Sequence, residues 1–182
     1  SFVSHSIEQA KKLIAEYENP EREAKYGSAR MYAWGQQHKH LKEMKAICGL
    51  KNAPIFCPIV SDFYSGMEVT IPLFANNLLK GSAEEIKNLY KSRYNSQIMY
   101  YKDADTGDGT TSAASLSGKD AMTISVCGNE ERILLTAVYD NLGKGASGAA
   151  IEILNLILGV VVVAVTLAGQ GIVGSRTVHS FT

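Results

Sequence analysis

Three stretches of apolar residues place the strongest limit on how this chain can fold. Apolar side chains occupy every second position at residues 67–73 and 122–126, and residues 133–139 form an apolar run. A period of two is typical of a half-buried β-strand. Pro72 lacks an N–H and directs its strand toward a sheet edge. Residues 128–131 have the composition of a hairpin turn, so the second and third strands are expected to pair.

Helical signals interrupt these strands without a regular strand–helix alternation. A capping box at residues 6–9 predicts a helix that ends near Asn19–Pro20, and a second box at residues 82–85 begins another helix. Apolar residues also recur at helical spacing within 41–48 and 150–158. The sequence therefore predicts an α+β fold, in which helices cover one face of a largely antiparallel sheet.

Composition narrows the class of protein. The chain is 46% hydrophobic and 20% charged, so it can form a sizeable core. Its 18 basic and 18 acidic residues cancel, which argues against a nucleic-acid partner. Cys48, Cys57 and Cys127 are few and widely spaced, and none has the electropositive surroundings of a reactive thiol. We therefore expect structural cysteines and a reducing, cytoplasmic setting.

The two ends of the chain differ from its middle. Ser1 is not a natural initiator, so we expect one domain over residues 1–158 whose start is truncated. Residues 159–182 form an apolar tail, and the uncharged run 153–173 is long enough to suggest a membrane span. Its polar and glycine residues favour a non-membrane tail instead. The alternatives left open are a strand followed by the Gly-x-Gly-x-x-Gly turn of residues 169–174, and an added extension.

His38 and His40 are the first candidates for chemistry. Histidine titrates near neutrality and is suited to general acid–base catalysis. Two histidines at this spacing face the same way only in an extended segment. The alternative is a pair of surface or helix-capping residues. The remaining histidines, His5 and His179, lie near the termini, so no metal site is expected.

The segment 140–148 is the second candidate. It joins a predicted strand to a predicted helix through three glycines, so its N–H groups can face an anion. Lys144 would add a positive charge there. The alternative is a tight turn that needs only glycine's backbone freedom. The polar loop 103–115 is a further expectation, as a mobile segment or one placed over a site.

Four blocks of sequence resemble the second half of N-acetyl-γ-glutamyl-phosphate reductase. They are Tyr32-(x5)-His-Lys-His-Leu-Lys-Glu-Met44, Pro58-Ile-Val-Ser-Asp-Phe-Tyr-Ser-Gly-Met67, Ser115-Leu-Ser-Gly-Lys-Asp120, and Asp140-Asn-Leu-Gly-Lys-Gly-Ala-Ser-Gly-Ala-Ala150 with Asn155-Leu156. They occur in the family's order within residues 11–159. The lysine-pathway reductase of aminoadipyl phosphate is a close relative and remains an alternative.

The resemblance implies an NADPH-dependent reduction of an acyl phosphate to an aldehyde in arginine biosynthesis. In such enzymes a cysteine thiolate attacks the acyl phosphate, a histidine handles the proton, and hydride reduces the thioester. The family's histidine motif matches His38 and His40. The resemblance also implies a small-molecule acyl-phosphate substrate, a homo-oligomer, and a catalytic domain similar to that of glyceraldehyde-3-phosphate dehydrogenase. The residues expected against the NADP cofactor are Asn141, Gly143, Lys144, Gly145 and Ser147.

The chain departs from the family in several places. The family's nucleotide-binding half and its Gly-Cys-aromatic nucleophile motif precede the region that matches Ser1, and the three cysteines of this chain match other positions. Ser65 stands where the family has a basic residue, and residues 159–182 have no counterpart. We therefore expect the chain alone to be inactive as a reductase. The rival hypothesis is a non-enzymatic assembly or binding module with the same fold.

Overall fold

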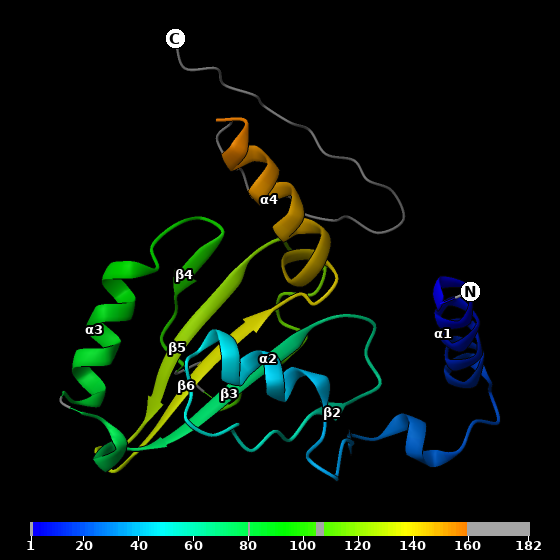
Figure 1. Cartoon of the computed structure of the whole chain (residues 1–182), viewed down its shortest axis with the longest axis horizontal. Coiled ribbons are helices and arrows are strands. Elements are labelled where there is room, and N and C mark those ends of the chain that lie inside the picture. Colours follow the sequence, from blue (N-terminus) through cyan, green and yellow to red (C-terminus); the bar gives the residue numbers. More distant parts are fainter. Residues whose placement is uncertain (1, 80, 105–107, 160–182) are drawn as a thin grey trace. The chain divides into compact units, whose positions relative to one another are not determined.

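The computed structural model describes residues 2–79, 81–104 and 108–159, which divide into two compact units, Ser1–Phe63 and Tyr64–Thr182 (Figure 1). The first unit contains two helices, one short 3-10 helix and a pair of two-residue strands. They are α1 (Phe2–Glu18), the 3-10 helix Ala24–Gly27, β1 (Arg30–Met31), α2 (Lys39–Ile47) and β2 (Ile59–Val60). β1 and β2 pair in antiparallel fashion.

The first helix confirms one sequence prediction and corrects another. α1 ends at Glu18, two residues before Pro20, as expected from the conformational limit that proline places on its neighbour. It begins at Phe2, however, so Ser6 lies within the helix and does not cap it. A capping signal inside a longer helical stretch does not stop the helix from extending upstream.

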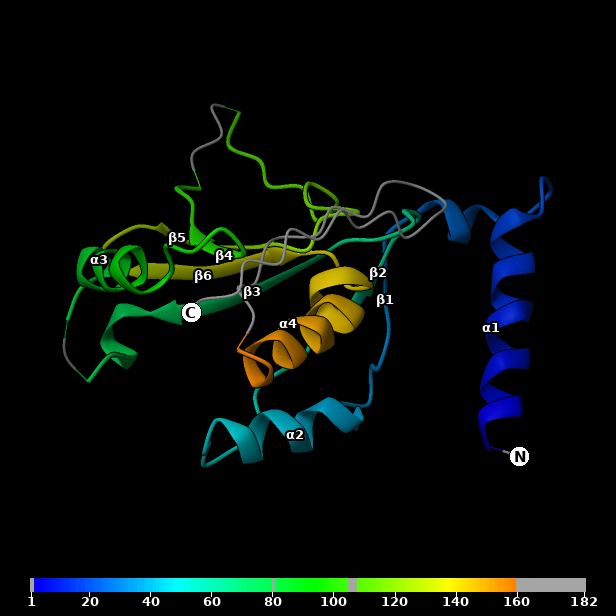
Figure 2. The same cartoon turned by 90° about the horizontal axis from the view of Figure 1, so that it is seen from above.

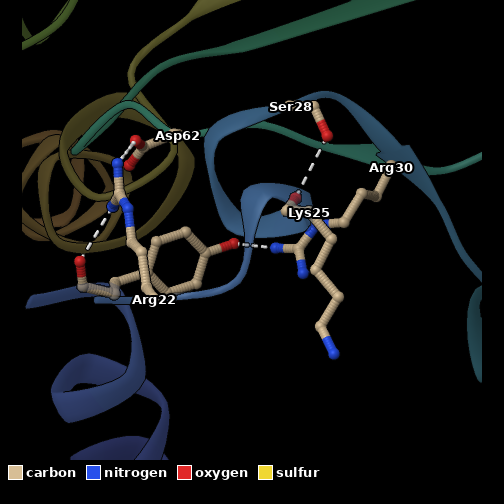
Figure 3. A network of polar contacts seen from close by, with 6 residues as sticks. Arg22, Lys25, Ser28, Arg30 and Asp62 are labelled. Atoms are coloured by element: carbon tan, nitrogen blue, oxygen red, sulfur yellow. Dashed lines mark hydrogen bonds and ion pairs between the residues drawn. The ribbon is translucent and has the colours of Figure 1, made fainter. Parts of the chain in front are cut away.

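Polar contacts join the end of α1 to the β1–β2 pair (Figure 3). The guanidinium of Arg22 donates to the backbone oxygen of Tyr17 at 2.8 Å and to a carboxylate oxygen of Asp62, just after β2, at 2.5 Å. Arg30 of β1 donates to the hydroxyl of Tyr17 and lies 4.7 Å from the ring centroid of Tyr26. Cationic groups over tyrosine rings are attracted by the ring's negative face. This network links the end of α1 to the β1–β2 pair within the first unit.

α2 matches its sequence prediction. It begins after His38, buries Leu41, and ends at Ile47 with Cys48 as the C-cap. Gly49 follows with φ of 62°, a left-handed conformation that favours glycine at a helix end. The helical spacing within residues 41–48 puts Cys48 on the same face as Leu41, but at the C-cap Cys48 is exposed.

The second unit is built on a four-stranded sheet in the order β3-β6-β5-β4 (Figure 1). Its strands are β3 (Met67–Phe74), β4 (Met99–Tyr101), β5 (Met122–Gly128) and β6 (Arg132–Tyr139). Its helices are the 3-10 helix Ala75–Asn77, α3 (Ala83–Arg93), a π-helical turn (Gly143–Ser147) and α4 (Gly148–Ile157). α3 begins with the predicted capping box, in which Ser82 and Glu85 exchange side-chain bonds to backbone N–H groups.

The sheet confirms the α+β prediction. β3 pairs with β6 and β6 pairs with β5 in antiparallel fashion, whereas β4 runs parallel to β5. The β5–β6 connection is the predicted hairpin, and β3, which contains Pro72, is an edge strand. A proline is tolerated there because an edge strand leaves half of its N–H groups unpaired.

The apolar side of β3 is more exposed than its alternating pattern predicted. Val69 and Ile71 expose 40% and 51% of their surface. Their partners in β6 are Ala137 and Leu135, so these side chains share one face of the sheet. α3 packs against β5 and β4, away from β3, which leaves this face open within the second unit. We call the surface formed by Val69, Ile71, Leu135 and Ala137 the apolar sheet face.

The opposite face of the sheet carries polar side chains beside Leu134 and Val138, and it lies under the loop that precedes β5. Thr70 and Thr136 face each other there at 3.4 Å. The described part of the loop contributes to a cavity of about 510 Å³ on this side. The residues that line this cavity are Glu68, Thr70, Ala104, Gly109, Thr111, Cys127, Leu134 and Thr136. In Figure 2, where the sheet is seen edge-on, α4 and this loop lie on opposite sides of it.

In the part of the chain that the structure describes, no helix is long and apolar enough to cross a membrane. α4 ends at Ile157, and the strand and Gly-x-Gly-x-x-Gly turn suggested for the tail fall beyond residue 159, outside the described residues.

Candidate functional site

The two histidines lie together at the start of α2. His38 is the N-cap residue, with extended backbone angles, and its Nδ1 accepts the backbone N–H of His40 at 3.3 Å. The two ring centroids are 4.5 Å apart. His38 therefore caps the helix and also lies beside His40, because its backbone is extended and the first turn of α2 brings His40 back toward it.

Aromatic rings from distant sequence positions surround this pair. The ring of His38 lies 5.9 Å from that of Tyr32 and 5.3 Å from that of Phe56. Phe56 is held by Gln36, whose side-chain amide donates to the Phe56 carbonyl at 2.7 Å and accepts its N–H at 2.9 Å. The β1–β2 pairing brings these segments side by side. The histidines therefore belong to a built cluster, which we call the histidine cluster (Tyr32, Gln36, His38, His40, Phe56).

The segment that leads into His38 contains an unusual backbone. Ala33 and Gln36 both have positive φ, 56° and 51°, although neither is glycine. The left-handed conformation costs roughly 1–2 kcal/mol for an ordinary residue. The paired hydrogen bonds between Gln36 and Phe56 offset this cost. Such local strain is found at functional sites more often than elsewhere.

The capping bond also limits the chemistry of each ring. Because Nδ1 of His38 accepts a hydrogen bond, the neutral ring carries its proton on Nε2. His40 is exposed, and its Nε2 lies 4.0 Å from a carboxylate oxygen of Glu43. Both side chains are exposed, so this contact contributes little to stability. His40 is therefore the histidine whose ring nitrogens remain accessible from solvent.

In the second unit, Asp140 organises the glycine-rich segment. Its side chain is 1% exposed. Oδ1 accepts the N–H groups of Leu142 and Gly143 at 2.7 and 2.8 Å. Oδ2 accepts the N–H of Gly118 at 2.5 Å and the hydroxyl of Ser65 at 2.7 Å. Four donors thus converge on one buried carboxylate that has no cation among these partners.

These donors determine the charge of Asp140. Burial by itself would raise the pKa of this carboxyl, but the hydrogen bonds from Ser65, Gly143, Gly118 and Leu142 outweigh it and hold the pKa below its usual value. The carboxylate is therefore ionised at neutral pH. Its negative charge also occupies the N–H groups of Leu142 and Gly143, so they are not free to face an external anion, as the sequence had suggested they could be.

Two side chains extend this cluster toward the surface. Ser117 is an exposed residue, and its hydroxyl lies 2.6 Å from that of Ser65. Oδ1 of Asn141 accepts the N–H of Gly66 at 2.8 Å. Gly66 has φ of 129°, and a Cβ there would lie 2.4 Å from the carbonyl oxygen of Ala113. Only glycine allows the two chain segments to approach this closely.

Buried charges lie beneath the π-helical turn. The ammonium of Lys144, a residue only 8% exposed, forms a short ion pair with Glu152 of α4. Asp120 is 5% exposed, and its Oδ1 has no hydrogen-bond partner. A Cβ on Gly148 would lie 1.9 Å from that oxygen. Burial raises the pKa of Asp120, and the nearby ammonium of Lys144 only partly opposes it. The buried ion pair between Lys144 and Glu152 thus links the π-helical turn to α4.

The structure groups the predicted residues into two sites. His38 and His40 form one in the first unit, while Asn141, Gly143, Lys144, Gly145 and Ser147 form the turn in the second. Sequence reasoning missed the roles of Ser117 and Glu152. Two signals in the sequence were available. Ser117 lies in one of the blocks that resemble the family, and Glu152 is one of the few charged residues near the C-terminal helix.

Within residues 2–79, 81–104 and 108–159, the cysteines and the acidic groups form no metal-binding cluster. Cys57 is exposed, and Cys127 is half-buried, with its thiol 3.7 Å from the carbonyl oxygen of Leu134. Among the described residues, no three metal-ligating side chains lie close enough to hold an ion.

Comparison with known proteins supports one family. Residues 11–141 match the family model described as semialdehyde dehydrogenase, dimerisation domain. The chain is 39% identical over 163 residues to N-acetyl-gamma-glutamyl-phosphate reductase 2 of Nostoc sp., which covers 82% of this chain and 50% of that protein. It is 38% identical over 157 residues to the reductase of Allorhizobium ampelinum, covering 81% of this chain and 50% of that protein.

The chain spans about half the length of the curated relatives it matches. The matched region contains the histidine cluster, the whole sheet and Asp140. Its mixed fold agrees with that of the family, whose domain is the C-terminal domain of the glyceraldehyde-3-phosphate dehydrogenase type. On this match, the chain belongs to the semialdehyde dehydrogenase dimerisation-domain family.

Proposed function

We propose that this chain supplies the acid–base histidine and the cofactor-facing turn of an NADP-dependent reductase that converts N-acetyl-γ-glutamyl phosphate into N-acetylglutamate semialdehyde. The observation that carries the proposal is the histidine cluster at the start of α2. Its rings are 4.5 Å apart and are held by a capping bond and a ring of aromatic side chains. The names of the relatives at 38–39% identity support the choice of reaction.

The reaction needs a group that moves a proton. A cysteine thiolate, which we place in a region outside the matched domain, attacks the acyl carbon, and the carbon–oxygen bond to phosphate breaks as the carbon–sulfur bond forms. NADPH supplies the hydride that reduces the resulting thioester. The aldehyde forms as the sulfur leaves, and the leaving thiolate takes a proton. We assign this proton transfer to His40, since His38 is engaged in capping through Nδ1.

The residues of the second unit fit the nicotinamide end of the cofactor. Asn141 accepts the N–H of Gly66 through Oδ1, so its amide N–H₂ group remains to donate to a carbonyl oxygen. Gly143, Lys144, Gly145 and Ser147 shape the turn that carries Asn141. The N–H groups of Gly143 and Gly145 are bound to Asp140, that of Ser147 is bound to the carbonyl of Leu142, and Lys144 is paired with Glu152. A nicotinamide therefore suits the turn better than a phosphate.

A second copy of this chain is the partner that we propose for the apolar sheet face. This face belongs to a domain whose family is named for dimerisation, and Val69 and Ile71 on it are 40% and 51% exposed. Ile71→Lys should shift the chain toward monomer in sedimentation velocity, because a charge cannot be buried there cheaply. Glu68→Lys, on the opposite face, is the matched control. Equal sedimentation of I71K and the unsubstituted chain would place the contact elsewhere.

We also propose that residues 1–158 act as one functional domain and that the protein works in the cytoplasm. Tested alone, the 182-residue chain should show no reductase activity. Phosphate-dependent reduction of NADP by this chain with N-acetylglutamate semialdehyde would overturn that expectation.

The central experiment is activity in an enzyme completed with the nucleotide-binding, cysteine-bearing half of a relative. His40→Ala should lower kcat by roughly 10²–10⁴-fold, the usual contribution of general acid–base catalysis. His38→Ala should lower it less, and Lys39→Ala, between them, should leave it unchanged. Loss of assembly without loss of turnover per assembled enzyme would favour the rival assembly module. Full activity in both histidine variants would contradict the proposed reaction mechanism.

A further inference from the structure

The backbone pairing of β1 with β2 stops short of the histidine cluster. Beyond the paired residues, the N–H of Tyr32 donates to the carbonyl of Pro58 at 3.0 Å. Proline has no N–H to return a second bond, and the chain after Tyr32 turns left-handed at Ala33, whose φ is 56°. The two-stranded ladder therefore does not reach Phe56, which lies two residues before Pro58.

The side chain of Gln36 continues the pairing where the backbone ladder ends. Its amide donates to the Phe56 carbonyl at 2.7 Å and accepts the Phe56 N–H at 2.9 Å. These are the two bonds that opposing residues exchange in an antiparallel sheet. Two contacts to one residue fix both the position and the direction of the backbone of Phe56. The loop that carries Gln36 also leads directly into His38.

The ring of Phe56 packs beside both imidazoles. Its centroid lies 5.3 Å from that of His38 and 6.1 Å from that of His40, within the range of packed aromatic pairs. His38 is also held by its capping bond. His40 is exposed, and its contact with Glu43 is long, at 4.0 Å. The packing of Phe56 and His38 against its ring therefore limits how His40 can rotate.

We propose that Gln36 is a positioning residue for His40, which it aligns by holding Phe56 in place. It acts through the Phe56 ring and takes no part in the proton transfer itself. Because that transfer is the step assigned to His40, this role rests on the proposed function and deepens it. Proton transfer requires an aligned donor and acceptor, so a small change in ring direction lowers turnover. The left-handed backbone of Gln36 is a local cost that this placement of its side chain requires.

Two substitutions separate positioning from stability. Gln36→Met keeps a side chain of similar length at the left-handed position but removes both hydrogen bonds. Gln36→Gly removes the same bonds and relieves the backbone, because glycine adopts a φ of 51° without steric cost. Q36G should therefore melt at a higher temperature than Q36M, whereas both variants should lose the alignment of His40. Gln37→Ala, which alters the neighbouring exposed glutamine, is the matched control.

The first measurement is NMR on the 182-residue chain with isotope-labelled histidine and phenylalanine side chains. In the unsubstituted chain and in Q37A, the ring of Phe56 should show nuclear Overhauser contacts to the imidazoles of His38 and His40. These contacts should disappear in Q36M and in Q36G. Contacts that persist at full strength in either variant would overturn the proposal, since the amide of Gln36 would then not be what holds Phe56.

The second measurement is turnover in the enzyme completed with the nucleotide-binding, cysteine-bearing half of a relative. Both Gln36 variants should lower kcat by about 10–100-fold with little change in KM, because misalignment affects proton transfer more than substrate binding. Q37A should keep the unsubstituted values. Unchanged kcat in both variants, or recovery of kcat in Q36G along with its melting temperature, would overturn the positioning role.

The two measurements also separate this role from the proposed reaction. Inactivity of the completed enzyme with Gln36 intact would refute the proposed function. The NMR comparison would still decide whether Gln36 positions the rings of Phe56 and His40.

Discussion

Replacing the buried carboxylate of Asp140 by an amide tests the central interaction of the second unit. In Asp140→Asn, Oδ1 can still accept from Leu142 and Gly143, but these bonds lose the help of a full charge. The new amide N–H₂ group faces the N–H of Gly118, which loses its acceptor. A buried donor without a partner costs about 1–3 kcal/mol, and each weakened charged bond adds about 1 kcal/mol. We expect a total loss of about 3–5 kcal/mol.

The assay is equilibrium unfolding in urea followed by far-UV circular dichroism. Asp103→Asn is the matched control in the same unit. Asp103 is exposed and forms surface ion pairs with Lys87 and Lys91, which contribute little to stability. The free energy of unfolding should fall far more in D140N than in D103N. Equal effects of the two substitutions would refute the view that Asp140 organises the unit.

A milder variant covers the case in which D140N does not fold. Ser65→Ala removes one of the four donors and should cost about 1–2 kcal/mol. Because the folded protein holds the pKa of Asp140 below its usual value, its stabilising effect is present above the unfolded pKa of about 3.9. It is lost as the pH falls through the lower folded pKa. Stability that did not decline in acid would contradict this account.

Three further substitutions test other parts of the fold. Gly66→Ala should lower the free energy of unfolding by more than about 2 kcal/mol in urea, because its Cβ would lie 2.4 Å from a carbonyl oxygen at a positive φ. Asp120→Asn should stabilise the chain at pH 7, since burial raises the pKa of Asp120 and stability declines as the pH rises from the unfolded toward the folded pKa. A thermal-melting midpoint for D120N below that of the unsubstituted chain at pH 7 would be evidence against this reasoning. Ser82→Ala should cost about 1 kcal/mol through loss of the helix cap to Glu85, and unchanged unfolding would show that α3 does not depend on it.

The elements that local patterns control were predictable. The strands at 67–74, 122–128 and 132–139 follow from alternation or apolar runs, and α3 follows from its capping box. These signals act within one or two turns of chain, so neighbouring residues suffice to specify them. The family resemblance through His38, His40 and the segment after Asp140 was likewise contained in short motifs, and the family match confirms it.

Other features depend on contacts between distant residues. The open face of β3 could not be predicted, because its alternation is the same whether or not a helix packs on it. The start of α1 was placed five residues too late, at Ile7 instead of Phe2, because the cap signal at Ser6 did not stop the helix from extending upstream. The contacts of the π-helical turn at residues 143–147 could not be predicted either. Asp140 accepts the N–H of Gly143, and Lys144 pairs with Glu152.

The sequence by itself determined the α+β class, the edge position of β3 and the family, because each rests on local periodicity or on short motifs. Only the tertiary structure decided what the charged and polar residues do. Lys144 could be assigned to an external anion until Glu152 was seen to pair with it, and the hydroxyl of Ser65 is committed as a donor to Asp140. Ser65 lies 52 positions from Ser117 and 75 positions from Asp140 in the sequence, so these hydrogen-bonding groups meet only in the folded chain.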